Sequence, residues 1–163
     1  MKKIILILIS IIAMQAAVAQ QTAPKANAQT QGKVKYLTTD EFLNKVWNYR
    51  VDSTAWKYRS TRPCVIDFYA TWCGPCKMLS PIVEQLSNEQ PGIDFYKVDV
   101  DKEKELAAVF GVRSIPMLLF VPKRGTPQAV QGLQSKEVLM RIIDHVIYGR
   151  VPQATQQQPA QQQ

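Results

Sequence analysis

Two kinds of hydrophobic pattern alternate along residues 33–151. Short, nearly continuous apolar runs at residues 65–70, 93–100 and 117–121 are typical of buried strands. A further short run at residues 128–131 follows a turn-forming segment and predicts a hairpin with the run before it. The apolar residues after Cys73 and after Ser135 instead recur every three or four positions, which predicts helices there.

Capping signals mark the starts of the predicted helices. Thr38 and Glu41 have the spacing of a capping box, which predicts a helix that begins at Thr39. Asp101 and Ser135 are expected to cap two later helices. From residue 65 onward, the order β-α-β-α-β-β-α predicts a single α/β domain in which helices cover a mixed sheet.

The amino-terminal segment has the pattern of a cleavable signal peptide. Two lysines precede an apolar run at residues 4–14, and residues 17–19 supply the small side chains that signal peptidase recognises. The run is shorter than the roughly 20 residues that a membrane span needs, and an uncleaved anchor is the alternative. We therefore predict export to the periplasm, without stable membrane insertion after cleavage. The predicted division is a signal peptide (1–19), a flexible tail (20–32), a folded domain (33–151) and a Gln-rich disordered tail (152–163).

Composition narrows the classes of function. The chain has 163 residues, of which 46% are hydrophobic and 20% charged, and this balance excludes a wholly disordered chain and a polytopic membrane protein. Part of the net charge of +7 lies in a long polar connection at residues 48–62. That connection carries no recognisable nucleic-acid-binding motif, so we interpret its basic residues as a solvated face and expect no nucleic-acid partner.

The segment Cys73-Gly74-Pro75-Cys76 carries the chemistry. It follows a predicted strand and opens a predicted helix, where unpaired backbone N–H groups and the helix dipole favour a thiolate. We therefore predict that Cys73 is the nucleophile in disulfide exchange. Cys76 lies close enough in the sequence to attack a mixed disulfide on Cys73 and release the product as a Cys73–Cys76 disulfide.

Three separated segments resemble the thioredoxin family. They are the sequence DFYATWCGPCK at residues 67–77, GVRSIP at residues 111–116 and VQGL at residues 130–133. The resemblance implies a thioredoxin fold, with a central mixed sheet flanked by helices in a single domain. It also implies a protein-disulfide oxidoreductase that needs no cofactor, and Gly-Pro between the cysteines favours a reductant over an oxidase or isomerase.

The resemblance also implies roles for residues outside the dithiol. Asp67 matches the family's buried acid, which accepts and returns the proton of the second cysteine, and Lys97 matches the lysine beside that acid. The run around Asp67 is otherwise typical of a buried strand, so the residues alone predict that burial raises the pKa of this carboxyl, and an exposed acid at a strand end is the alternative. From the sequence alone, Lys97 would be a solvated strand lysine. The family's cis-proline corresponds to Pro116. The expected surface for substrate binding comprises Trp72, Gly74, Pro75, Ile115, Pro116 and Gly132.

Other uses of the cysteines fit less well. A structural zinc site needs about four ligands, and the other candidates, Cys64 and His145, lack paired-ligand spacing, so we expect no metal. A cysteine protease would need a positioned histidine, whereas His145 falls inside a predicted helix. Cys64 begins the strand that leads to Cys73, and roughly 20 Å of strand should keep it from forming a disulfide with either active-site cysteine.

The predicted disulfide exchange implies two kinds of partner. They are client proteins that carry a disulfide or thiols, and an electron donor. For an exported reductant, we expect this donor to be a thiol-redox conduit in the membrane. We expect a monomer. An oxidase or isomerase, and a non-catalytic binding module on the same fold, stay open as alternatives.

Overall fold

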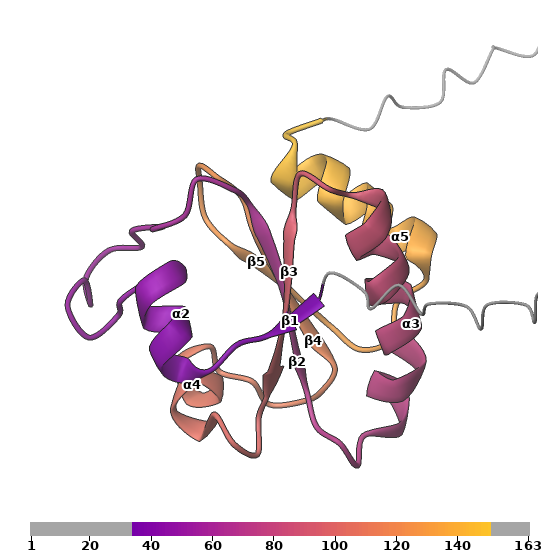
Figure 1. Ribbon diagram of the computed structural model, residues 1–163, viewed down its shortest axis with the longest axis horizontal. Coiled ribbons are helices and arrows are strands. Elements are labelled where there is room, and N and C mark those ends of the chain that lie inside the picture. The colour runs from indigo at the N-terminus through magenta and orange to yellow at the C-terminus, as the bar shows by residue number, and fades with distance from the viewer. Residues whose placement is uncertain (1–33, 151–163) are drawn as a thin grey trace, which may run out of the picture. The chain divides into compact units, whose positions relative to one another are not determined.

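The computed structural model describes residues 34–150. The predicted signal peptide and both predicted tails therefore lie outside the described residues. The chain forms a five-stranded sheet with helices on both sides (Figure 1). The elements are β1 (Val34–Tyr36), α2 (Thr39–Lys45), β2 (Cys64–Tyr69), α3 (Gly74–Glu89), β3 (Asp94–Asp99), α4 (Lys104–Val109), β4 (Met117–Val121), β5 (Gln128–Gln131), α5 (Lys136–Ile142) and the π-helix η1 (Ile143–Ile147).

The sheet is mixed, as predicted. Its strand order is β1-β3-β2-β4-β5, so β2 lies in the middle. β3 runs parallel to both β1 and β2, whereas β4 is antiparallel to β2 and to β5. In this register Asp67 of β2 lies between Lys97 of β3 and Leu118 of β4. The central strand therefore carries an acid at its middle, with one basic and one apolar neighbour.

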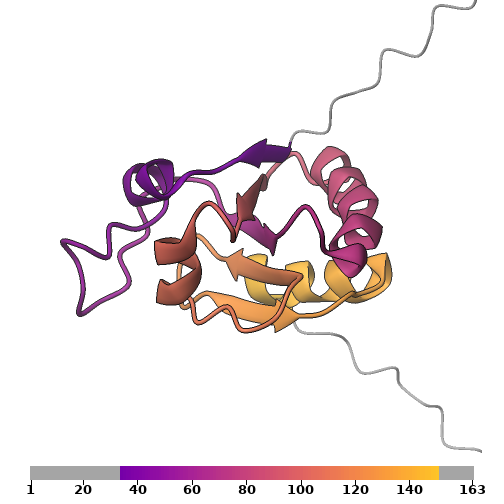
Figure 2. The same cartoon turned by 90° about the horizontal axis from the view of Figure 1, so that it is seen from below.

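The two faces of the sheet are covered by different helix pairs. α2 and α4 lie on one side and α3 and α5 on the other, as both views show (Figures 1 and 2). Side chains alternate along a strand, so Ile66 and Phe68 pack on the face of α2 and α4, whereas Val65 packs with α3 and α5. Asp67 shares the parity of Val65, which places it beneath α3.

The start of α2 has the predicted capping box. The Glu41 backbone N–H donates to the Thr38 hydroxyl, and the Glu41 carboxylate accepts from the Thr38 backbone N–H. Of the other two capping predictions, one is confirmed and one is wrong. Ser135 caps α5 as predicted, because its hydroxyl accepts from the backbone N–H of Val138. The prediction for Asp101 was wrong: α4 begins at Lys104 and has no side-chain cap.

The connection between α2 and β2 is more than a polar loop. Four aromatic side chains from it pack against the core beneath α2 and α4, namely Trp47, Tyr49, Trp56 and Tyr58. The segment is also attached to α4, since Arg50 and Tyr49 both donate hydrogen bonds to the Glu105 carboxylate. The predicted basic face is solvated, and its arginines and lysine are exposed. Irregular spacing of the aromatic residues hid this packing from a periodicity analysis.

Two further elements differ from the sequence-based expectation. β1 was not predicted, because three residues are too few to establish an alternating pattern. The final helix was predicted as one regular helix, but its last part widens into η1, where the Tyr148 N–H donates to the Ile143 carbonyl five residues earlier. None of the helices within residues 34–150 is long and apolar enough to cross a membrane.

Candidate active site

The turn from β2 into α3 brings the two active-site cysteines together. Cys73 and Cys76 are 4% and 3% exposed, and their sulfur atoms form a disulfide of 2.06 Å. The Cys73 N–H donates to the Ala70 carbonyl at 3.2 Å, which fixes the turn that follows the strand. The site therefore stands at the carboxyl end of the central strand.

Cys73 occupies the N-cap position of α3. Its sulfur accepts a hydrogen bond from the backbone N–H of Cys76 at 3.1 Å. α3 is 16 residues long and has no acidic residue in its first turn, so the positive end of its dipole is not neutralised there. Both features stabilise negative charge on the Cys73 sulfur once the disulfide is reduced. This geometry supports Cys73 over Cys76 as the nucleophile.

The exposed surface beside the disulfide includes an indole ring held in place. Trp72 is 68% exposed, and its Nε1–H donates to the Asp101 carboxylate at 2.8 Å. This contact gives Asp101 a role that its sequence position did not suggest. Gly74 and Pro75 are exposed next to Trp72, so the predicted binding residues on this side of the dithiol are accessible.

The other side of the predicted binding surface comes from the loop before β4 and the end of β5. The Ile115–Pro116 peptide bond is cis, as the resemblance implied. Ile115 packs against the buried cluster of Ala70, Cys73 and Cys76. The Pro116 carbonyl accepts from the Gly132 N–H at 2.8 Å, and Gly132 has a φ of 85°, which favours glycine. Pro116 itself is buried, so it supports this surface from below and leaves Ile115 nearer the solvent.

Asp67 is the buried acid of the site. It is 1% exposed, and neither carboxylate oxygen has a hydrogen-bond partner among the described residues. Burial raises its pKa from 3.8 to about 6, and the charge of Lys97 offsets part of that rise. The alternative interpretation of an exposed acid at a strand end was therefore wrong.

Lys97 is also less solvated than a strand lysine would be. Its side chain is 12% exposed, and its Nζ lies 3.8 Å from the Asp67 carboxylate. The same Nζ donates a hydrogen bond to the Ser80 hydroxyl of α3 and lies 5.0 Å from the centroid of the Tyr69 ring. Ser80 and Tyr69 could not be predicted as site residues, because nothing in the local pattern marks a serine on a helix or a strand tyrosine as part of a site.

The third cysteine lies apart from the dithiol. Cys64 is buried at the start of β2 and forms no disulfide. Burial raises the pKa of its thiol to about 12, so it is a poor nucleophile near neutral pH. His145 is exposed in η1. Within residues 34–150, no cluster of three or more Cys, His, Asp or Glu side chains could hold a metal ion.

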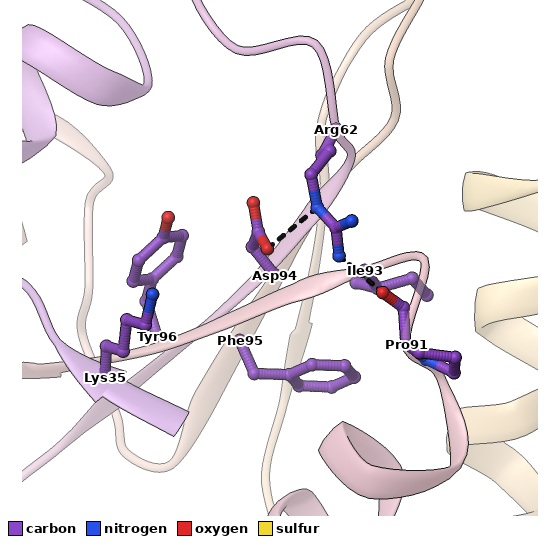
Figure 3. Close-up of a pocket in the computed structure, with 7 residues that line it drawn as sticks. All are labelled: Lys35, Arg62, Pro91, Ile93, Asp94, Phe95 and Tyr96. Atoms are coloured by element: carbon purple, nitrogen blue, oxygen red, sulfur yellow. Dashed lines mark hydrogen bonds and ion pairs between the residues drawn. The ribbon is translucent and has the colours of Figure 1, made fainter. Parts of the chain in front are cut away.

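A small hollow at the opposite end of the sheet does not belong to the site. It has a volume of about 210 Å³ and lies at the start of β3, where Asp94, the pairing partner of Cys64, is one of the residues that line it (Figure 3). Arg62 crosses it to reach the Asp94 carboxylate at 3.0 Å and also donates to the Pro91 carbonyl. Arg62, one of two basic side chains that line the hollow, is thus engaged in contacts within the protein.

Comparison with known proteins agrees with the geometry. The thioredoxin family model matches residues 33–145. The chain is similar to a thioredoxin of Borreliella burgdorferi, with 48% identity over 108 residues, which cover 66% of this chain and 92% of the relative. A bifunctional thioredoxin reductase/thioredoxin of Mycobacterium leprae is 37% identical over 89 residues, or 54% of this chain and 19% of that protein. The crystal structure of a thioredoxin from Malassezia sympodialis has a TM-score of 0.55 and 30% identity, covering 71% of this chain and 93% of that one.

The buried charge of Asp67 predicts a pH-dependent stability. Because the carboxyl has a pKa of about 6 in the folded protein and an ordinary value in the unfolded chain, ionisation destabilises the fold as the pH rises from about 4 to above 6. We expect Asp67→Asn in the oxidised protein to raise the free energy of unfolding at pH 8 by up to about 3 kcal/mol, with little effect below pH 4.

Urea unfolding at several pH values tests this expectation. Asp144→Asn is the matched control, since that acid is half-exposed and pairs with Arg150 at 2.7 Å, and its loss should change the stability by less than about 1 kcal/mol. Equal stability of the Asp67→Asn and wild-type proteins at pH 8 would show that the carboxyl carries no buried charge.

Proposed function

Because this chain belongs to the thioredoxin family of protein-disulfide oxidoreductases, we propose that it is an exported reductant of protein disulfides. The observation that carries the proposal is the position of Cys73 at the N-cap of α3. There its sulfur accepts a hydrogen bond from the Cys76 backbone N–H and also forms a disulfide with the sulfur of Cys76. One cysteine is thus prepared to attack a disulfide, and the other is in place to complete the exchange.

The reaction begins with the reduced dithiol. The Cys73 thiolate attacks one sulfur of a client disulfide, forms a mixed disulfide and releases the first client thiolate. Cys76 then loses its proton, and its thiolate attacks the Cys73 sulfur. This second step releases the other client thiolate and leaves the Cys73–Cys76 disulfide found in the structure. The two released thiolates take up protons, and two electrons have passed to the client.

Asp67 is proposed to take the proton from Cys76. The carboxylate lies on the face of the sheet that α3 covers, and its pKa of about 6 makes it ionised yet basic near neutral pH. Its oxygens have no hydrogen-bond partner among the described residues, so they are free to accept a proton, directly or through water. Burial thus suits this carboxyl to general base catalysis.

Clients are proposed to bind on the surface between Trp72 and Ile115. Trp72 is exposed and hydrogen-bonded to Asp101, and Ile115 packs against the buried cluster that contains both cysteines. An extended client segment can form main-chain hydrogen bonds with the backbone at Ile115, and such contacts recognise little of the client's sequence. We therefore expect a broad range of protein substrates.

The compartment determines which partner must supply electrons. Export through the predicted signal peptide would bring the dithiol into an oxidising environment, where a reductant needs continuous reduction. We propose a thiol-redox conduit in the membrane as the donor. The Mycobacterium leprae relative, which is named as both a reductase and a thioredoxin, supports pairing with a dedicated reductase.

The reduction potential separates a reductant from an oxidase. We expect a value near −270 mV, the level typical of thioredoxin, since Gly74 and Pro75 add no side-chain donor that would stabilise the thiolate further. Equilibration with glutathione gives the potential, and turnover of insulin disulfides with dithiothreitol tests the activity. A potential near −120 mV would assign the protein to the oxidases, and absence of turnover would contradict an enzymatic role.

The two cysteines should behave differently when each is replaced. Cys76→Ser leaves the nucleophile but removes the group that resolves the mixed disulfide, so it should accumulate covalent complexes with clients. Cys73→Ser should form none, because Cys76 lies inside the first turn of α3 and lacks the N-cap position at which a backbone N–H stabilises the Cys73 thiolate. Non-reducing gel electrophoresis with insulin as the client measures both. Trapping by Cys73→Ser at the rate of Cys76→Ser would reverse the assignment.

A further inference from the structure

We propose that Ser80 is a positioning residue for the proton transfer, because its hydroxyl holds the Lys97 ammonium back from the Asp67 carboxylate. The inference rests on the proposed function, in which Asp67 accepts the proton of Cys76. It adds a residue of α3 that sets the distance between the Asp67 carboxylate and the Lys97 ammonium.

Ser80 and Asp67 both lie near the Lys97 ammonium and compete for it as hydrogen-bond acceptors. Its Nζ donates a hydrogen bond to the Ser80 Oγ, whereas the nearer Asp67 oxygen is 3.8 Å away. A charge-assisted hydrogen bond between an ammonium and a carboxylate normally spans about 2.7–2.9 Å. The ammonium therefore stops short of a direct bond to Asp67 by about 1 Å while it is bound to the serine hydroxyl.

Ser80 also stands in the right place relative to Cys76. The two residues are four positions apart on α3, so they share the helix face that packs on the sheet. Cys76 is buried on that face, and Ser80 reaches Lys97 from it. The serine thus lies one helical turn from the thiol whose proton must move.

Few other charges act on Asp67. Lys97 faces it from β3, and the titratable Tyr69 lies two residues further along β2. β4 presents the apolar Leu118, and α3 contributes Ser80, whose hydroxyl binds Lys97. Within residues 34–150, Lys97 is the one cation whose charge lowers the pKa of this carboxyl. The position of its ammonium therefore decides how strongly the charged form of Asp67 is stabilised.

Removing the Ser80 hydroxyl should let Lys97 close on Asp67. The Lys97 side chain is mostly buried and would lose a hydrogen-bond partner, so the uncompensated carboxylate becomes its best acceptor. A direct ion pair lowers the pKa of an acid by about one to three units. In the Ser80→Ala protein we therefore expect Asp67 to titrate at lower pH and to be a weaker base for Cys76.

The test follows the Asp67 carboxyl carbon by NMR as a function of pH. The oxidised protein is used because its active-site cysteines do not titrate. We expect the Ser80→Ala midpoint to fall by about one pH unit or more, and the Ser80→Thr midpoint to stay near the wild-type value because the hydroxyl is kept. Ser87→Ala is the matched control, since Ser87 is a buried serine of α3 whose hydroxyl donates to the Glu84 carbonyl. It should leave the midpoint unchanged.

A kinetic measurement on the reduced protein links the shift to the reaction. The rate at which Cys76 resolves a mixed disulfide should fall at low pH as Asp67 becomes protonated, and in Ser80→Ala this fall should begin at a lower pH. An unmoved or raised midpoint, or a lowered midpoint without a change in the rate profile, would overturn the role of Ser80. Asp67→Asn separates the two claims: if it keeps the wild-type rate profile, the proposed proton acceptor itself is wrong.

Discussion

The start of α3 at the end of the central strand is the constraint on which the site depends. β2 is buried on both faces and paired on both edges, so its carboxyl end has a fixed position in the molecule. The chain turns there and places Cys73 at the N-cap, where its sulfur accepts the Cys76 N–H at 3.1 Å. The unpaired N–H groups of the first turn are a feature of any helix, but here they meet a sulfur atom. The proposed nucleophile and the proposed resolving group are thus placed by one local geometry.

A second constraint is the charge beneath that helix. Asp67 lies in the middle of a sheet with apolar layers on both sides, where an ionised carboxyl is costly. A tight ion pair with Lys97 would reduce that cost but would also make the acid a weaker base. The observed separation of 3.8 Å lies between full pairing and isolation, and Ser80 holds the lysine there. Stability and proton transfer therefore place opposite demands on the same contact.

The sequence predicted the parts of the protein that have a strong local signal. The capping box at Thr38, the strand around Asp67 and the helix after Cys73 all follow from spacing, and they locate the dithiol correctly. Contacts between distant segments could not be predicted in this way. The hydroxyl of Ser80 meets Lys97 only because α3 packs across β3, and Asp101 holds Trp72 instead of capping a helix. Such pairings arise from the packing of elements, so no periodicity within one element reveals them.

The most direct test of the central claim is the pH dependence of alkylation at each cysteine in the reduced protein. Reaction with iodoacetamide, followed by mass mapping, reports the thiolate fraction of Cys73 and Cys76 separately, and the buried Cys64 serves as an unreactive reference. The account predicts that Cys73 is modified first, with a midpoint clearly below the ordinary thiol value of about 8.5. Faster modification of Cys76, or a Cys73 midpoint at or above that value, would contradict it.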